Sequence, residues 1–292
     1  MIIIRLKGGL GNQMFQYAFG RALSMRRNEP ILLDTSGFGK EPSIDTPREY
    51  ALGAYNIQEQ FANLLVTAPF NTKRASFFRK IKRRLLRLND FTYHSSLAHS
   101  RATFFEGFWN NEKYFKEFSK TIRHEFTLKN NLTAAAEKIV TQMIQENKEG
   151  IQTVSLHVRR GDYISNPYAR AEHNIVTLEY YEKALFYLAS KIKKDNIKIY
   201  IFSDDVPWVK HNLKMPDYAV EYVNLEAGAL RDAEEMHLMS LCSNNIIANS
   251  TYSWWGAWLN RNPSKIVIAP LQWIRNPYIN THDVCPPEWI RL

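Results

Sequence analysis

The chain has 292 residues, which is enough for two domains of ordinary size. Its hydrophobic content of 45%, with 13% aromatic residues, excludes an intrinsically disordered protein. The formal charge of +9 points to an anionic partner, which a nucleotide, a nucleic acid or a membrane surface would satisfy.

Two further features limit the class of protein. Cys242 and Cys285 lie far apart, which argues against a disulfide framework and against a cysteine-based zinc site. No run approaches about 18 apolar residues, and the opening apolar run ends at Arg5, so we expect neither a membrane span nor a secretory signal. We therefore expect a cytoplasmic protein.

The predicted elements alternate between strands and helices at both ends of the chain. Residues 1–34 predict a βαβ unit, with strands over 2–6 and 30–34, and residues 40–145 look more helical. Five further strands, separated by helices, are predicted over 151–158, 197–202, 219–223, 245–249 and 265–269. This alternation predicts an α/β fold with parallel sheets. The simplest architecture is two Rossmann-like halves, one domain over 1–150 and another over 151–292.

The loop after the first strand is rich in glycine. Gly8, Gly9 and Gly11 precede a helix, whose first N–H groups are free to bind an anion. The dinucleotide-binding pattern G-x-G-x-x-G fails, because Met14 stands where the third glycine would be. Asp34, at the end of the next strand, keeps an NAD-linked oxidoreductase open as an alternative. A tight turn without a binding role is another.

The stretch VSLHVRRGDY ends a buried strand with charged residues. His157, Arg159, Arg160 and Asp162 stand at the carboxyl end of this strand, the edge of an α/β sheet where ligands bind. Because side chains alternate along a strand, His157 and Arg159 should share one face and Arg160 should point to the other. A surface Arg–Asp pair is the simpler alternative.

Two later strand ends also carry polar residues. Ser203, Asp204 and Asp205 precede Pro207, a pattern typical of a helix N-cap. These adjacent carboxylates lack D-x-D spacing, and no His or Cys spacing gives a ligand set, so we expect no metal site. The other strand-to-helix junction has amide and hydroxyl groups that would cap the helix or hold a phosphate: Asn249, Ser250, Thr251 and Ser253.

Residues 73–88 predict a basic amphipathic helix with eight Lys and Arg residues. Such a helix would lie on an anionic membrane, bind nucleic acid, or pack on the protein as a solvated helix. No zinc finger or RNA-binding signature supports a nucleic-acid partner, so we expect none. A basic membrane- or nucleic-acid-binding protein without enzymatic activity stays open as an alternative to an enzyme.

Four motifs, GGLGNQMFQYA, HVRRGDY, IFSDD and NSTYSWWGAWL, occur in this order along nearly the whole chain. Together they resemble the α-1,2-fucosyltransferase family, inverting enzymes that use GDP-fucose. The resemblance implies a GT-B fold, two Rossmann-like domains facing a cleft, with the acceptor on the side of residues 1–150 and the donor mainly in residues 151–292. It also names the expected anion as a nucleoside diphosphate.

The resemblance assigns roles to individual residues. It places His157 at the guanine side of the donor, Arg159 on the pyrophosphate, Asn12 toward the reacting sugar, and Glu235 as an acceptor of hydrogen bonds from guanine. Further positions that it implies in donor binding are Gly9, Gly11, Arg160, Ser203, Asp204, Asn249, Ser250, Thr251 and Ser253.

The chemistry implied by the resemblance needs no metal cofactor. An arginine and helix N-termini would stabilise the charge on the leaving diphosphate, and a base would take the proton from the acceptor hydroxyl. We expect Arg159, Asn12, Asp162 and His173 in the catalytic set, with Glu172 and the Asp204/Asp205 pair as other candidate bases. His173 is followed by Asn174 where bacterial relatives often have glycine, a departure that bears on the local turn.

The expected reaction moves L-fucose from GDP-β-L-fucose to the 2-hydroxyl of a terminal β-galactoside, with inversion. The expected setting is the synthesis of a surface polysaccharide or O-antigen. Residues 73–88 are the candidate for peripheral contact with the inner face of the cytoplasmic membrane.

Overall fold

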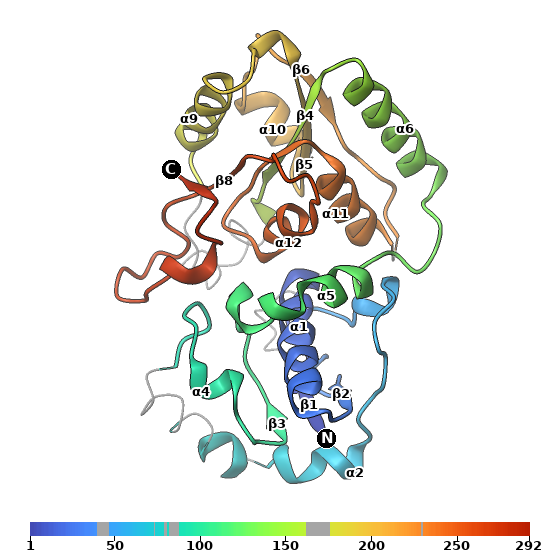
Figure 1. Ribbon diagram of the computed structural model, residues 1–292, viewed down its shortest axis with the longest axis vertical. Helices are drawn as coiled ribbons and strands as arrows, with labels where there is room; N and C mark the ends of the chain where they lie inside the picture. Colours follow the sequence, from blue (N-terminus) through green and yellow to red (C-terminus); the bar gives the residue numbers. More distant parts are fainter. Residues whose placement is uncertain (40–46, 73, 79–80, 82–87, 162–175, 229) are drawn as a thin grey trace. The chain divides into compact units, whose positions relative to one another are not determined.

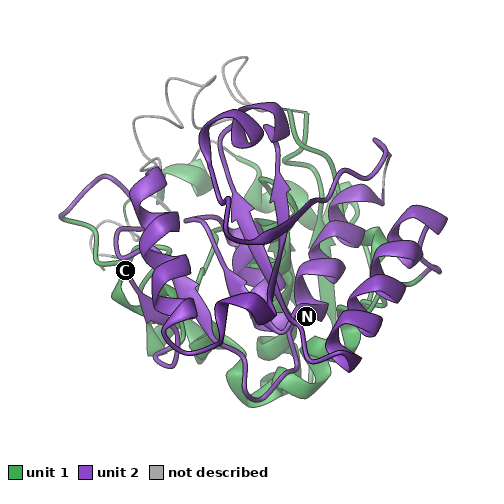
Figure 2. Cartoon of the chain, turned by 90° about the horizontal axis from the view of Figure 1, so that it is seen from above, with its two compact units in different colours: residues 1–129, 278–286 green, residues 130–277, 287–292 purple. Residues whose placement is uncertain are grey.

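A computed structural model describes residues 1–39, 47–72, 74–78, 81, 88–161, 176–228 and 230–292. The chain forms two compact units, which Figure 2 colours separately. Unit 1 holds residues 1–129 and 278–286, and unit 2 holds residues 130–277 and 287–292. The domain boundary near residue 150 that the strand pattern predicts stays a prediction.

Unit 1 is built on a parallel sheet in the order β2-β1-β3. Its strands are β1 (Ile2–Arg5), β2 (Ile31–Asp34) and β3 (Phe104–Phe105). α1 (Leu10–Arg27) follows β1 and buries Phe19, whose ring packs edge-on against Phe105 of β3 at 5.4 Å between centroids. The helix therefore covers the sheet through aromatic contacts.

In the described ranges, the other named elements of unit 1 are short. They are η1 (Leu52–Ala54), α2 (Leu64–Thr67), η2 (Ala68–Phe70), α4 (Ser95–Ala98), η3 (Glu112–Tyr114), η4 (Lys116–Phe118), α5 (Ser119–Glu125) and η6 (His282–Val284). The predicted βαβ unit is confirmed. The sequence did not predict β3, because two residues are too few to show a period-two pattern.

Unit 2 contains a six-stranded parallel sheet in the order β6-β5-β4-β7-β8-β9. Its strands are β4 (Gln152–Val158), β5 (Ile197–Ser203), β6 (Ala219–Tyr222), β7 (Asn244–Ile246), β8 (Val267–Ala269) and β9 (Ile290–Arg291). Its helices are α6 (Ala134–Lys148), α9 (Leu178–Ala189), η5 (Lys194–Asn196), α10 (Val206–Asn212), α11 (Arg231–Leu241) and α12 (Thr251–Leu259). This is the Rossmann strand order, so the predicted α/β class is confirmed.

Helices cover both faces of this sheet, as Figure 1 shows for α6 and α9. On one face Val154 and Leu156 of β4 pack with residues of α9 and α10. On the other face Tyr200 and Phe202 of β5 pack with residues of α6 and α11. Because helices cover both faces, consecutive residues of β4 and β5 are buried, and these include the polar Ser155 and His157.

The strand order reverses beside the first strand of each unit. In unit 2 the chain passes from β4 to β5 on one side and returns to β7 on the other. In unit 1 it passes from β1 to β2 and returns to β3 on the opposite side. Loops diverge at such points and leave a crevice at the carboxyl ends of the strands. Among the described helices none is both long and apolar enough to cross a bilayer.

Candidate functional site

The carboxyl ends of β4 and β5 place charged residues side by side in unit 2. Val158 of β4 is in register with Ser203 of β5, so the residues that follow them lie at the same sheet edge. Arg159 Nη1 is 2.8 Å from Asp204 Oδ2. An arginine and a carboxylate from different motifs thus form an ion pair at the point where the strand order reverses.

Asp204 also fixes the turn after β4. Its Oδ1 accepts a hydrogen bond from the backbone N–H of Arg160 at 2.9 Å, and its Oδ2 accepts one from Gly161 at 3.1 Å. A Cβ atom on Gly161 would be only 2.7 Å from Asp204 Oδ2. A side chain at this position would therefore displace the Asp204 carboxylate and disturb its contacts with the turn.

Arg160 has a different environment from Arg159. Its Nε is 3.3 Å from Asp205 Oδ2, and its guanidinium carbon lies 3.4 Å from the centroid of the Trp208 ring. Asp205 caps α10 by accepting the backbone N–H of Trp208 at 3.1 Å, which confirms the N-cap predicted for this stretch. Arg160 thus braces α10 on the α9 and α10 side of the sheet, as the alternation along β4 predicts.

His157 is buried and neutral. Its residue is 3% exposed, and burial lowers the pKa of the imidazole from 6.5 to about 4. Asp204 opposes this shift and Arg159 adds to it. Within the described part of the chain, His157 Nδ1 is buried without a hydrogen-bond partner. This atom is therefore a candidate to form a hydrogen bond with a bound ligand.

The β7–α12 junction borders His157. The centroid of the His157 ring lies 5.6 Å from that of Tyr252 in the first turn of α12. Ser250 caps this helix by accepting the Tyr252 N–H at 3.3 Å, while Asn249 donates to the Trp273 carbonyl at 3.0 Å. Two predicted roles of these polar groups, capping and anion binding, are compatible here, because a helix N-terminus still offers other N–H groups.

The predicted junction residues divide into two kinds. Ser253 is fully buried, and its hydroxyl donates weakly to the carbonyls of Ala248 and Ser250. Thr251 is half-buried at the first helical position. Of these two, Thr251 is thus the better placed to meet a ligand.

Glu235 lies on α11 and is buried. Its Oε1 accepts from Arg231 Nε at 2.9 Å, and it also accepts a hydrogen bond from the backbone of Leu225. Burial raises the pKa of this carboxyl, against the lowering effect of Arg231. Tyr252 Oη donates to the Asp232 carbonyl at 2.6 Å, so α11 begins beside the first turn of α12. Arg231 was not predicted, although its i,i+4 spacing from Glu235 indicates that the two side chains lie close together.

The glycine-rich loop of unit 1 is held by amide groups. Gly8 has φ +76°, and Asn12 Nδ2 would be 2.8 Å from a Cβ atom at this position. Gln13 is fully buried and donates to the carbonyls of Gly8 at 2.8 Å and Glu49 at 2.7 Å. Gly9 is the N-cap of α1 and has no side chain to occupy the first N–H groups. The loop is therefore a fixed backbone surface with Asn12 beside it.

Other residues near this loop were not predicted. Lys7 Nζ lies 4.8 Å from the centroid of the Phe108 ring, and Arg48 Nη1 would be 3.9 Å from a Cβ atom on Gly9. Arg48 belongs to a distant segment with no motif, so no signal in the sequence pointed to it, whereas Phe108 lies in the aromatic stretch FFEGFWNNEKYF.

Asp34, the residue that kept the NAD alternative open, is buried. It accepts from Arg5 Nη2 at 2.8 Å and from the Ser36 N–H at 3.0 Å. A ribose would have to displace the Arg5 contact, which argues against the dinucleotide interpretation.

Three predicted residues, Asp162, Glu172 and His173, lie outside the described residues, and their roles stay predictions. In the described ranges no group of three or more His, Cys, Asp or Glu side chains is placed to hold a metal ion.

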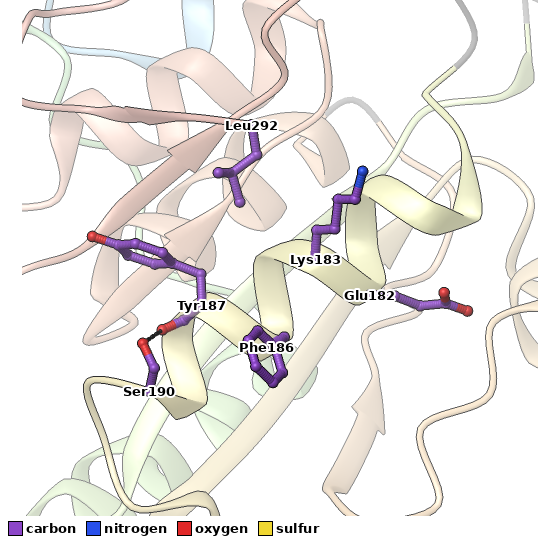
Figure 3. Close-up of a pocket in the computed structure, with 6 residues that line it drawn as sticks. All are labelled: Glu182, Lys183, Phe186, Tyr187, Ser190 and Leu292. Atoms are coloured by element: carbon purple, nitrogen blue, oxygen red, sulfur yellow. Dashed lines mark hydrogen bonds between the residues drawn. The ribbon is translucent and has the colours of Figure 1, made fainter.

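A pocket of about 570 Å³ lies on the outer side of α9 (Figure 3). Its lining is mostly apolar and consists of Glu182, Lys183, Phe186, Tyr187, Ser190 and Leu292. None of the strand-end residues lines it. Because it lacks a set of converging polar groups, we assign it no chemistry.

Comparison with known proteins identifies the family of this chain. The model of the family described as "Glycosyl transferase family 11" matches residues 1–292. The sequence is 34% identical to an alpha-1,2-colitosyltransferase of Escherichia coli over 100% of this chain and 99% of that protein. It is 35% identical to the O-antigen biosynthesis glycosyltransferase WbnK of Escherichia coli, covering 98% of this chain and 99% of the relative. The human galactoside alpha-(1,2)-fucosyltransferase 1 is 25% identical over 52% of this chain and 42% of its own length.

Among solved structures, the fucosyltransferase NodZ from Bradyrhizobium is similar with a TM-score of 0.50. The match covers 87% of this chain and 91% of that one at 15% identity. At this identity the match shows the fold, and the predicted GT-B class is confirmed. The family that the four motifs indicated is confirmed as well.

Proposed function

The chain belongs to glycosyl transferase family 11, and on this premise we propose that it moves L-fucose from GDP-β-L-fucose to the 2-hydroxyl of a terminal β-galactoside, with inversion. The observation that carries the proposal is Arg159 beside the buried, neutral His157 at the strand reversal of a Rossmann sheet. The full-length similarity to an O-antigen glycosyltransferase supports a role in O-antigen synthesis.

The donor is proposed to bind at the β4, β7 and α11 edge of unit 2. Arg159 would donate hydrogen bonds to the diphosphate. The diphosphate would either share the guanidinium with Asp204 or take the place of Asp204. His157 would direct Nδ1 to the nucleoside side, and the first turn of α12, with Ser250 and Thr251, would add N–H and hydroxyl donors. A carboxylate at Glu235 can accept from both N1–H and the 2-amino group of guanine, which adenine lacks.

Arg160 is proposed to support the site rather than to bind the diphosphate. Its guanidinium is already engaged by Asp205 and Trp208. Ser203 and Asp204 would act on the donor through the same framework, since Ser203 Oγ accepts the Asp205 N–H at 3.0 Å and Asp204 holds the turn. Gly9, Gly11 and Asn12 of unit 1 are proposed to meet the reacting sugar or the acceptor.

The reaction breaks the bond between the fucose C1 and the β-phosphate oxygen, and GDP leaves with the electron pair. The acceptor oxygen attacks C1 from the opposite face and gives its proton to a base. Arg159 would stabilise charge that grows on the diphosphate in the transition state. Asp162 and His173 are the residues proposed to accept this proton.

Colitose is the competing donor sugar, because a full-length relative is named a colitosyltransferase. The test is product analysis after incubation with GDP-fucose or nucleotide-activated colitose and a panel of galactosides, in excess EDTA. We expect an α-1,2-linked fucosyl product without added metal. Transfer of colitose alone would overturn the donor, and activity that returns only with Mn²⁺ or Mg²⁺ would overturn metal independence.

Protection from unfolding by NAD but not by GDP would revive the oxidoreductase alternative.

A further inference from the structure

Nearly all of the net charge of the chain lies in one stretch. From Gln60 to Asn89 the sequence has eight Lys and Arg residues and no Asp or Glu. The remaining chain has 30 basic residues (38 − 8) against 29 acidic ones. The anionic partner that the composition predicts is therefore sought first at this stretch rather than over the whole surface.

The described residues of this stretch expose large apolar side chains. Leu64 and Leu65 in α2 are 75% and 85% exposed. Phe61, Phe77 and Phe78 are 51%, 60% and 55% exposed. We call these five residues the apolar edge. Single exposed apolar residues are common, but five large ones in a segment of 18 residues are a high density for a surface that faces only water.

The apolar edge is held in place by unit 1. Phe61 pairs with Leu33 of β2 through a parallel bridge, and Phe70 of η2 stacks on Phe104 of β3 with centroids 4.7 Å apart. The segment thus runs from the β2 side to the β3 side of the sheet, and Figure 1 draws α2 at the margin of unit 1.

α2 shows its apolar side chains outward although it is capped. Asn63 accepts the Val66 N–H at 2.9 Å, while the polar Thr67 is buried at 1% exposure. A helix that buries threonine and exposes two leucines has the reverse of the usual pattern for a water-facing helix. Its outer side is therefore suited to an apolar environment.

We propose that the apolar edge docks unit 1 on an anionic lipid surface, with Leu64 and Leu65 in the acyl boundary, and that the positive charge of the stretch from Gln60 to Asn89 favours anionic lipids. A second copy of this chain is disfavoured, because two stretches of charge +8 would repel each other. Nucleic acid is disfavoured, because adjacent exposed leucines gain nothing from a phosphate backbone. Residues 73, 79–80 and 82–87 lie outside the described residues, so the membrane role of segment 73–88 as a whole stays a prediction.

The test is co-sedimentation with vesicles of phosphatidylcholine alone or mixed with phosphatidylglycerol. We compare the unaltered protein with Leu64→Ser/Leu65→Ser, and use Phe186→Ser as the matched control, because Phe186 is 79% exposed on α9 in unit 2. We expect binding to the anionic vesicles, a partition coefficient at least about tenfold lower in the double variant, and no change in the control. Raising NaCl from about 0.1 M to about 1 M, which shortens the Debye length from about 10 Å to about 3 Å, should weaken binding as strongly.

Several outcomes would overturn the proposal. They are no binding to anionic vesicles, equal binding to phosphatidylcholine alone, an unaffected double variant, and self-association or nucleic-acid binding in place of vesicle binding. Turnover of a soluble acceptor, measured in parallel, should be equal in all three proteins. That readout depends on the proposed function and vesicle binding does not, so the failure of one is distinguishable from the failure of the other.

Discussion

The reversal points of the two sheets use different chemistry. In unit 2 the edge consists of ion pairs, with Arg159 on Asp204 and Arg160 on Asp205. In unit 1 the corresponding loop is positioned by uncharged amides, since Gln13 binds the backbone of Gly8 and Glu49. We infer from this difference that unit 2 stabilises charge on a bound group, whereas unit 1 positions uncharged groups.

This difference gives a rule for mutations. Changes at the edge of unit 2 should act on the binding or departure of a charged group. Changes at the loop of unit 1 should act on the position of uncharged groups and leave nucleotide affinity alone.

The largest expected effect belongs to Arg159→Lys. Lysine keeps the charge but loses the planar fork, and removing a donor aimed at developing charge costs about 10²–10³ in kcat. Arg160→Lys is the matched control, because its partners are Asp205 and Trp208. We expect it to keep most of the turnover and to lower Tm slightly. The measurements are kcat and Tm of both variants. A larger loss of kcat in Arg160→Lys than in Arg159→Lys would show that Arg160 holds the diphosphate.

His157 should make stability depend on pH. Burial lowers the pKa of this imidazole to about 4 in the folded chain, against about 6.5 unfolded, so in that window only the unfolded state takes up the proton. Stability should fall as the pH falls from about 6.5 to about 4, by on the order of 3 kcal/mol from this group. Denaturation of the nucleotide-free protein and of His157→Gln across this range gives the contribution as a difference. Parallel curves for the two proteins would mean that the imidazole is not held neutral.

Glu235→Gln should weaken GDP binding about tenfold or more, since losing one charge-assisted contact costs roughly 1.5–3 kcal/mol. Glu234→Gln is the neighbouring control, because Glu234 accepts from the backbone N–H and hydroxyl of Thr133 and serves the start of α6. Calorimetry should show that only the Glu235 change affects GDP affinity. Equal GDP affinity in both variants would remove Glu235 from the nucleotide site and limit it to its contact with Arg231.

The sequence predicted those parts of the fold that repeat a pattern over many residues. β4 was predicted from the alternation of Val154, Leu156 and Val158 and β5 from its largely apolar run, whereas β3 and β9 have two residues and depend on their neighbours for pairing. Which residues meet across the sheet is set by strand register, and register is a property of the whole sheet.

The candidate site shows the same limit. The sequence placed Arg159 and Asp204 at strand ends, but their ion pair and the two backbone contacts of Asp204 follow from the β4–β5 register. The same applies to Trp208 under Arg160 and to Arg48 beside Gly9, contacts that join segments without a shared motif. The burial of His157 and its low pKa could not be predicted either, because they depend on the elements that cover that face of β4.

The smallest expected effect tests whether the glycine-rich loop of unit 1 positions Asn12. Gly8→Ala places a Cβ atom 2.8 Å from Asn12 Nδ2 and must also adopt φ +76°. Gly39 is the matched control, because it has φ +72° with nothing within 4 Å of an added Cβ atom. Both alanine variants should lose about 1 kcal/mol of stability, the cost of a left-handed alanine. Only Gly8→Ala should move Asn12, and we expect a loss of roughly tenfold in kcat, below the hundredfold that a 1 Å misplacement can cost.

GDP affinity should not change in either variant, because the loop of unit 1 is assigned to uncharged groups. Equal kcat in the two variants would show that Asn12 takes no part in the reaction, and a loss of GDP affinity in Gly8→Ala alone would show that both units bind the diphosphate.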